Sequence, residues 1–376
     1  MDILIIALFL FITLVVGLTY DRQVKTIKDY ALGGKNFSTA TLTATIVATY
    51  SSGSGFFIEL ENTYSNGLYY IIPVLGLCLN IWLIGQLAMR MEEFMNKVSI
   101  TEVMGSMYGR TVQTITACSS TLARIGYIGV QFKVISKILE TLFQLDGVTS
   151  VCIAAGIAIL YSAFGGVKAV TFTDVLQFFT FGTVIPILAL TVWNSVQAPT
   201  RVIATLANNP LFDLKQVVGW HPRFFSSVGL FFYFAIPGLF GPSVFQRIAM
   251  AKNVRQARRS FSYAAVTFLL VVLITFWIGI LLLTDMPGLA KEQVVPYMIN
   301  QYTCTGLKGL LGVGVMALAM STADSELNAI SVIFANDIVR PLMRKTHNSV
   351  SIARFFSVVA GILALCMALY TVLYSN

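Results

Sequence analysis

Residues 310–337 read LLGVGVMALAMSTADSELNAISVIFAND, and this stretch decides the fold. It begins as an apolar helix and then places a polar run, residues 321–328, in the middle of an expected membrane span. Hydrocarbon offers polar groups no hydrogen-bond partners, so such a run persists there only if it lines a protein cavity or has a function. The rest of the chain is therefore expected to pack around this helix.

One face of this helix collects oxygen atoms. The positions i, i+3, i+4 and i+7 are held by Leu318, Ser321, Thr322 and Ser325. They share a stripe that presents three hydroxyls and, at its start, a backbone carbonyl. Oxygens of this kind suit a hard cation such as Na⁺, although Ser and Thr also hydrogen-bond to neighbouring helices or to their own preceding turn. The nearby carboxylates of Asp324 and Glu326 favour the cation, because buried carboxylates are expensive.

Composition places the chain in a membrane. Of its 376 residues, 56% are hydrophobic and 11% are charged, whereas soluble domains are about 25% charged. Five cysteines without metal-type spacing indicate neither a disulfide framework nor a zinc site. The net charge of +8 is explained by loop charge bias, and no basic stripe suggests nucleic acid as a partner.

The hydropathy pattern predicts an all-α, polytopic membrane bundle of about ten transmembrane helices within a single transporter domain, residues 1–376. A barrel would instead show strands that alternate with period two. The expected spans are 2–20, 38–61, 68–89, 113–140, 149–163, 170–194, 225–245, 261–284, 306–335 and 351–374.

Charge in the connections predicts the orientation. The connections 21–36, 90–112, 164–169, 246–260 and 338–350 hold sixteen Lys and Arg, and the alternate set holds four. The positive-inside rule puts the first set in the cytoplasm and both termini outside. The connection 196–224 then becomes an external loop with a short surface helix.

Two of the spans contain helix breakers at mid-depth. The second span carries Ser51, Ser52, Gly53, Ser54 and Gly55, and glycine and serine there free carbonyls that can coordinate a cation. The seventh span carries the breakers Pro237, Gly238, Gly241 and Pro242. Corresponding broken helices five spans apart indicate an inverted-repeat transporter with its site between them, although Gly and Pro are also frequent in membrane helices.

A carboxylate near the start of the sixth span is the third unusual feature. Gly165 and Gly166 are expected to form a tight turn, and Asp174 follows about one turn inside the helix, with Gln177 beside it at i+3. Asp174 either coordinates a cation or carries a proton, or it is a helix-end charge favoured by the helix dipole.

Several phrases together resemble the sodium:solute symporter family, whose members take up sugars, proline, pantothenate or sialic acid. They lie at residues 29–35 (DYALGGK), 51–57 (SSGSGFF), 161–177 (YSAFGGVKAVTFTDVLQ), 241–252, 320–328 and 336–337. The resemblance implies a LeuT-like inverted repeat with one extra N-terminal helix, 2–20. The first repeat is expected at about 38–194 and the second at about 225–374, incomplete and apparently short at its C-terminal end.

The resemblance also implies site residues. The sodium ion is expected at the carbonyls of Leu318, Thr49 and Ser52 and the hydroxyls of Ser321 and Thr322. A possible second cation site is expected at Asp174, Ser321, Asp324 and Ser325. The solute is expected near Ser54, Phe56, Gln131, Phe240 and Pro242. The sequence departs from the family pattern at Glu59 and Glu61, which either lie in an outer vestibule or pair with Arg124 or Lys133.

These features predict sodium-coupled symport of a small organic solute, such as an amino acid, carboxylate, vitamin or sugar, across a plasma membrane or bacterial inner membrane. Na⁺ is the expected coupling ion, with no organic cofactor. The alternatives are a transporter-like sensory domain and a truncated, non-functional transporter. An enzyme is disfavoured, because His221 and His347 both lie in loops without a metal-type cluster or a plausible nucleophile.

Overall fold

The computed structural model describes residues 1–376 apart from 20–23, 197–198, 237–240, 342–348 and 375–376, and every regular element among the described residues is a helix. In chain order the elements are α1 (Asp2–Thr19), α2 (Ile27–Leu32), η2 (Gly33–Lys35), α3 (Thr39–Tyr50), α4 (Gly53–Asn66), α5 (Leu68–Ala88), η3 (Glu92–Phe94), α6 (Ile100–Tyr108), α7 (Arg110–Phe143), α8 (Gly147–Val196), α9 (Pro199–Asn208), η4 (Pro210–Phe212), α10 (Leu214–Val217), α11 (Pro222–Ala235), α12 (Pro242–Ala249), α13 (Val254–Asp285), η6 (Lys291–Gln293), α14 (Val294–Tyr302), α15 (Leu307–Ile333), the π-helix η7 (Phe334–Val339) and α16 (Ser349–Tyr374).

The multi-pass membrane character is confirmed. Six helices in the described part of the chain are long and apolar enough to cross a membrane: Asp2–Thr19, Leu68–Ala88, Gly166–Val196, Val254–Asp285, Leu307–Val339 and Ser349–Tyr374. The other predicted spans correspond to α7, to the apolar helix Gly147–Leu160, and to the pairs α3/α4 and α11/α12. The total of ten crossings stays a prediction.

Both predicted helix breaks are present. Helix α3 ends at Tyr50 and α4 begins at Gly53, where the Ser52 hydroxyl accepts a hydrogen bond from the Gly55 amide at 3.0 Å and so caps the new helix. In the seventh span, α11 ends at Ala235 and α12 begins with Pro242, whose missing N–H is not needed in a first helical turn. The predicted breakers Pro237 and Gly238 lie outside the described residues.

Helix α8 contains the two spans predicted at 149–163 and 170–194. Gly166 divides it with φ 61°, a left-handed backbone angle that a residue with a side chain rarely adopts. A Cβ at this glycine would also meet the ring of Tyr30 in α2 at 2.9 Å. A glycine is therefore favoured at position 166 for two reasons: the positive φ angle, and the lack of space for a side chain beside Tyr30.

Several short helices differ from the prediction. Three connections for which the sequence analysis named no helix contain α2, α6 and α14, and the loop 196–224 contains α9, η4 and α10 in place of one short helix. Helix α13 begins at Val254 and not near 261, because the Asn253 side chain accepts a hydrogen bond from the Gln256 amide and caps it.

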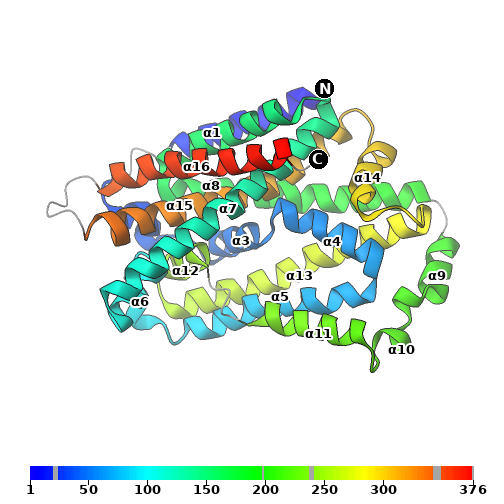
Figure 1. Ribbon diagram of the computed structural model, residues 1–376, viewed down its shortest axis with the longest axis horizontal. Coiled ribbons are helices and arrows are strands. Elements are labelled where there is room, and N and C mark those ends of the chain that lie inside the picture. The colour runs from blue at the N-terminus through cyan, green and yellow to red at the C-terminus, as the bar shows by residue number, and fades with distance from the viewer. Residues whose placement is uncertain (20–23, 197–198, 237–240, 342–348, 375–376) are drawn as a thin grey trace.

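Helix α15 lies at the centre of the bundle, as expected from its sequence (Figure 1). The most apolar 18-residue window of its span is 83% buried, against 22% in α1. Small residues allow its neighbours to approach: a Cβ at Gly314 would meet Val184 of α8 at 2.6 Å, and one at Gly53 of α4 would meet Ala319 at 2.9 Å. The broken helix α3/α4 is thus in direct contact with α15.

Candidate functional site

The predicted oxygen stripe on α15 faces the end of α3. The Ser321 hydroxyl lies 2.9 Å from the carbonyl oxygen of Ala48 and 3.0 Å from that of Leu318, and it can donate to either. The Thr322 hydroxyl donates to the Leu318 carbonyl at 3.2 Å. All three α15 residues are buried. Two hydroxyls and two carbonyls from two helices therefore converge beside the break between α3 and α4.

The two α3/α4 residues predicted to complete this site lie close by. Thr49 directly follows Ala48, and Thr49, Ser52 and Leu318 all line one central cavity. The α3 carbonyl in contact with Ser321 belongs to Ala48, one residue before the predicted Thr49.

A buried ion pair lies next to this stripe. The Arg247 guanidinium of α12 donates from Nη2 to Asp174 Oδ2 of α8 at 3.0 Å and to Ser325 Oγ of α15 at 2.5 Å. The Thr45 hydroxyl of α3 donates to the same Asp174 oxygen. The Arg247 and Asp174 side chains are 1% and 0% exposed, so the pair holds four helices together in a region without solvent screening.

Two residues of the predicted second cation site, Asp174 and Ser325, thus surround a guanidinium. Asp174 Oδ1 has no hydrogen-bond partner among the described residues. The structure also corrects one charge of the orientation count: Arg247 is buried and paired, which leaves fifteen charges in that set of connections. The role of Arg247 was not predicted, although its place just after the Gly241-Pro242 break was a signal for it.

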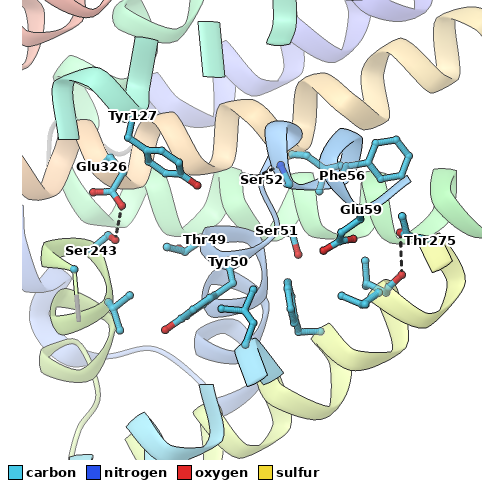
Figure 2. Close-up of a pocket in the computed structure, with 18 of the residues that line it drawn as sticks. Thr49, Tyr50, Ser51, Ser52, Phe56, Glu59, Tyr127, Ser243, Thr275 and Glu326 are labelled. Atoms are coloured by element: carbon cyan, nitrogen blue, oxygen red, sulfur yellow. Dashed lines mark hydrogen bonds between the residues drawn. The ribbon is translucent and has the colours of Figure 1, made fainter. Parts of the chain in front are cut away.

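A cavity of about 240 Å³ lies between the two broken helices, α7, α13 and α15 (Figure 2). It is lined by Thr49, Tyr50, Ser51, Ser52, Gly55, Phe56, Glu59, Leu77, Arg124, Tyr127, Ile185, Gly241, Ser243, Val244, Phe268, Val271, Val272, Thr275, Leu318 and Glu326. Because it touches both helix breaks and the oxygen stripe, it is the candidate solute site.

The predicted solute residues lie around this cavity in different ways. Phe56 forms part of its wall. The Gln131 amide donates to the Ser54 hydroxyl at 3.1 Å, and neither residue is among the described lining residues. Pro242 is buried between two wall residues, Gly241 and Ser243. Phe240 lies outside the described residues.

The cavity wall carries an ion pair that was not predicted. Arg124 Nη1 lies 3.2 Å from Glu326 Oε1, and the Ser243 hydroxyl donates to the same oxygen at 2.9 Å. Figure 2 shows Glu326 and Ser243 joined across the cavity wall. Arg124 is therefore paired with Glu326 and not, as one sequence alternative had it, with Glu59, which lines the cavity.

Comparison with known proteins finds similarity to sodium-dependent transporters. The model of the family described as "Sodium:solute symporter family" matches residues 30–375. A sodium/glucose cotransporter of Vibrio parahaemolyticus is 23% identical, with the match covering 98% of this chain and 74% of that protein. A putative sodium-dependent multivitamin transporter of Drosophila melanogaster is 22% identical, with 91% of this chain and 60% of that protein covered. The chain thus spans about three fifths of the length of the Drosophila relative.

The fold has a close counterpart among solved structures. A Na⁺-coupled sialic acid symporter, in a substrate-bound outward-open state, superposes with a TM-score of 0.91 at 21% sequence identity. The superposition covers 100% of this chain and 83% of the other.

Proposed function

Because the chain belongs to the sodium:solute symporter family, a family of transporters and not of enzymes, we propose that it carries a small organic solute across a membrane together with Na⁺. The proteins named above are a glucose cotransporter, a putative multivitamin transporter and a sialic acid symporter, so their names leave the solute open. The observation that carries the proposal is the convergence of α15 oxygens on the end of α3, beside a cavity. A plasma membrane or bacterial inner membrane is the proposed location.

The sodium ion is proposed to bind at the Leu318 carbonyl, the hydroxyls of Ser321 and Thr322, and the carbonyls of Thr49 and Ser52. A dehydrated cation needs about five or six oxygens in place of its water shell. Ser321 already lies within hydrogen-bond distance of carbonyls on both helices, so small shifts of these groups bring them around one ion. Ala48 offers a further carbonyl at the same place.

A second cation is proposed to share Asp174 with Arg247. Oδ2 of this carboxylate is committed to Arg247, whereas Oδ1 lacks a partner among the described residues. Ser325 of α15 lies beside the pair through its contact with Arg247, and it is proposed to supply the other oxygens together with Ser321 and Asp324. An ion there competes with the guanidinium for Ser325, so its affinity depends on where Arg247 lies.

Coupling follows from the shared helices. The proposed sodium oxygens come from the broken helix α3/α4 and from α15, and the same elements line the cavity through Thr49, Ser52 and Leu318. An ion that joins these helices stabilises one arrangement of the cavity, and the solute must in turn raise the affinity for the ion. Alternating access then arises from the movement of one group of helices against the other.

Uptake into liposomes tests this function. The purified chain is reconstituted and offered labelled amino acids, carboxylates, sugars and amines with an inward Na⁺ gradient, with K⁺ in place of Na⁺, and with no gradient. We expect accumulation of one class only with the Na⁺ gradient. Equal accumulation in K⁺ contradicts sodium coupling. A sensory domain predicts Na⁺ binding without accumulation, and a non-functional copy predicts neither.

A further inference from the structure

The charges on the cavity wall do not balance. Among the described lining residues the charged side chains are Glu59, Arg124 and Glu326. Arg124 and Glu326 neutralise each other at 3.2 Å. Glu59 points into the cavity from α4 (Figure 2), and it is a member of none of the ion pairs in the described part of the chain. One carboxylate therefore remains without a counter-charge inside the bundle.

Two further oxygen atoms on this wall lack donors. Ser51 Oγ and Glu326 Oε2 are buried and have no hydrogen-bond partner among the described residues. Buried polar groups are normally hydrogen-bonded, and an ionised carboxylate in a membrane bundle is expensive unless it is paired. The cavity therefore presents acceptors that a ligand with N–H donors can satisfy.

The rest of the wall is apolar and aromatic. Tyr50, Phe56 and Phe268 line it, and the rings of Tyr50 and Phe268 pack edge to face at 6.3 Å. Aromatic faces attract cations as well as apolar groups. The cavity volume of about 240 Å³ corresponds to roughly eight water molecules at about 30 Å³ each, which limits the ligand to a small molecule.

We propose that the transported solute carries a protonated amine, with its ammonium group bound by Glu59 and its N–H donors shared with Ser51 and Glu326. This inference rests on the proposed function and narrows its substrate class. A neutral sugar leaves Glu59 without a counter-charge, and a simple carboxylate is repelled by it. The paired Arg124 offers such an anion no free positive charge.

Thermal unfolding of the purified chain in detergent with Na⁺ tests the proposal without requiring transport. The probes are ethanolamine, ethylene glycol and glycolate, which each have two carbons and a hydroxyl and differ in their second group: an ammonium, a hydroxyl or a carboxylate. The same comparison is then repeated with the three- and four-carbon homologues. We expect the amines to raise the unfolding temperature in a saturable way and the diols and hydroxy acids not to. Equal or larger shifts with the neutral or anionic probes, or no shift with any amine, overturn the proposal.

Variants of Glu59 locate the effect. Glu59→Gln should weaken amine binding at least tenfold, and Glu59→Asp, which keeps the charge, should retain part of it. Glu61→Gln is the matched control, because Glu61 lies on the same helix but not among the described cavity-lining residues. The unfolding temperature without ligand shows that each variant folds. Unchanged amine binding in Glu59→Gln overturns the proposal.

Repeating the binding measurements in Na⁺ and in K⁺ distinguishes a failure of this proposal from a failure of the proposed function. Selective amine binding that is the same in Na⁺ and K⁺ supports the solute class and contradicts sodium coupling. Na⁺ binding that depends on Ser321 and Thr322, without amine selectivity, supports the sodium site and contradicts the solute class.

Discussion

Ser321 and Thr322 are the two residues at which the loss of one oxygen tests the sodium site most directly. Each hydroxyl lies near the Leu318 carbonyl, and that of Ser321 also reaches α3. Ser321→Ala and Thr322→Ala should each raise the Na⁺ concentration for half-maximal binding several-fold, because an ion with one missing ligand binds less tightly. A coupling energy of about 1–3 kcal/mol is at stake. Binding of ²²Na⁺ to the purified protein measures the half-maximal Na⁺ concentration of each variant.

The matched control is Ser331→Ala, further along α15. The Ser331 hydroxyl donates to the Asn328 carbonyl at 2.7 Å and is as buried as that of Ser321. Its removal should leave Na⁺ binding unchanged. Equal, small effects at all three positions mean that these hydroxyls serve helix packing.

Asp174 carries a second prediction, on stability as well as on cation binding. Asp174→Asn leaves the buried Arg247 charge without its carboxylate, and breaking a buried pair from one side costs about 3–5 kcal/mol. The variant should therefore unfold at a lower temperature in detergent and depend less on Na⁺ for solute binding. Circular dichroism melting and ²²Na⁺ binding are the measurements.

A double variant separates pairing from other roles of Asp174. Asp174→Asn with Arg247→Met removes both charges and should melt above Asp174→Asn alone, because no unpaired buried charge remains. If the double variant melts as low as or lower than the single one, the unpaired guanidinium is not the cause of the loss. If the Na⁺ dependence of solute binding is unchanged in Asp174→Asn, the second cation site is excluded, because the first sodium site does not use Asp174.

At the scale of elements, the close approach of α4 to α15 at the first residue of α4 requires a very small side chain. A Cβ at Gly53 would meet the Ala319 and Val134 side chains, each at 2.9 Å. Gly53→Ala should push the start of α4 away from α15, with an overpacking cost of about 1–3 kcal/mol, and weaken Na⁺ binding. Gly182→Ala is the control, because nothing lies within 4 Å of its added Cβ. Equal Na⁺ affinity in both variants contradicts a site that joins these helices.

The sequence predicted these elements where the signal is local. Helix breaks such as those at Ser52 and Pro242 can be predicted because Gly, Ser and Pro cause them, and these residues affect the backbone only within a few positions of themselves. The Arg247–Asp174 pair joins residues 73 positions apart, and no periodicity within one span reveals such a contact. Short helices such as α6 were missed because they lack the length of a hydrophobic span.

At the scale of the whole molecule, the connections sort into two ends of the bundle (Figure 1). Lys35 Nζ donates to the Met95 carbonyl at 2.5 Å, which joins two connections of the positively charged set. At the other end, Arg201 donates to the Thr284 carbonyl at 3.2 Å. Residues near both termini share this second end: Asp2 accepts from the Gly309 amide at the start of α15, and Val372 lies against Gly147.

The two sets of connections in the sequence differ in charge even after Arg247 is removed from the count, since fifteen Lys and Arg remain against four. The positive-inside rule therefore still predicts that the end with α2 and α6 faces the cytoplasm and that both termini lie outside. In a variant without native cysteines, Asn208→Cys at the exposed end of α9 should react with an impermeant maleimide added to intact cells, and Lys252→Cys should react only after permeabilisation. Both positions are exposed, so a difference in labelling reports sidedness and not burial. The reverse pattern would invert the orientation and exchange the proposed outer and inner entrances, while the ion and solute sites would stay where they are.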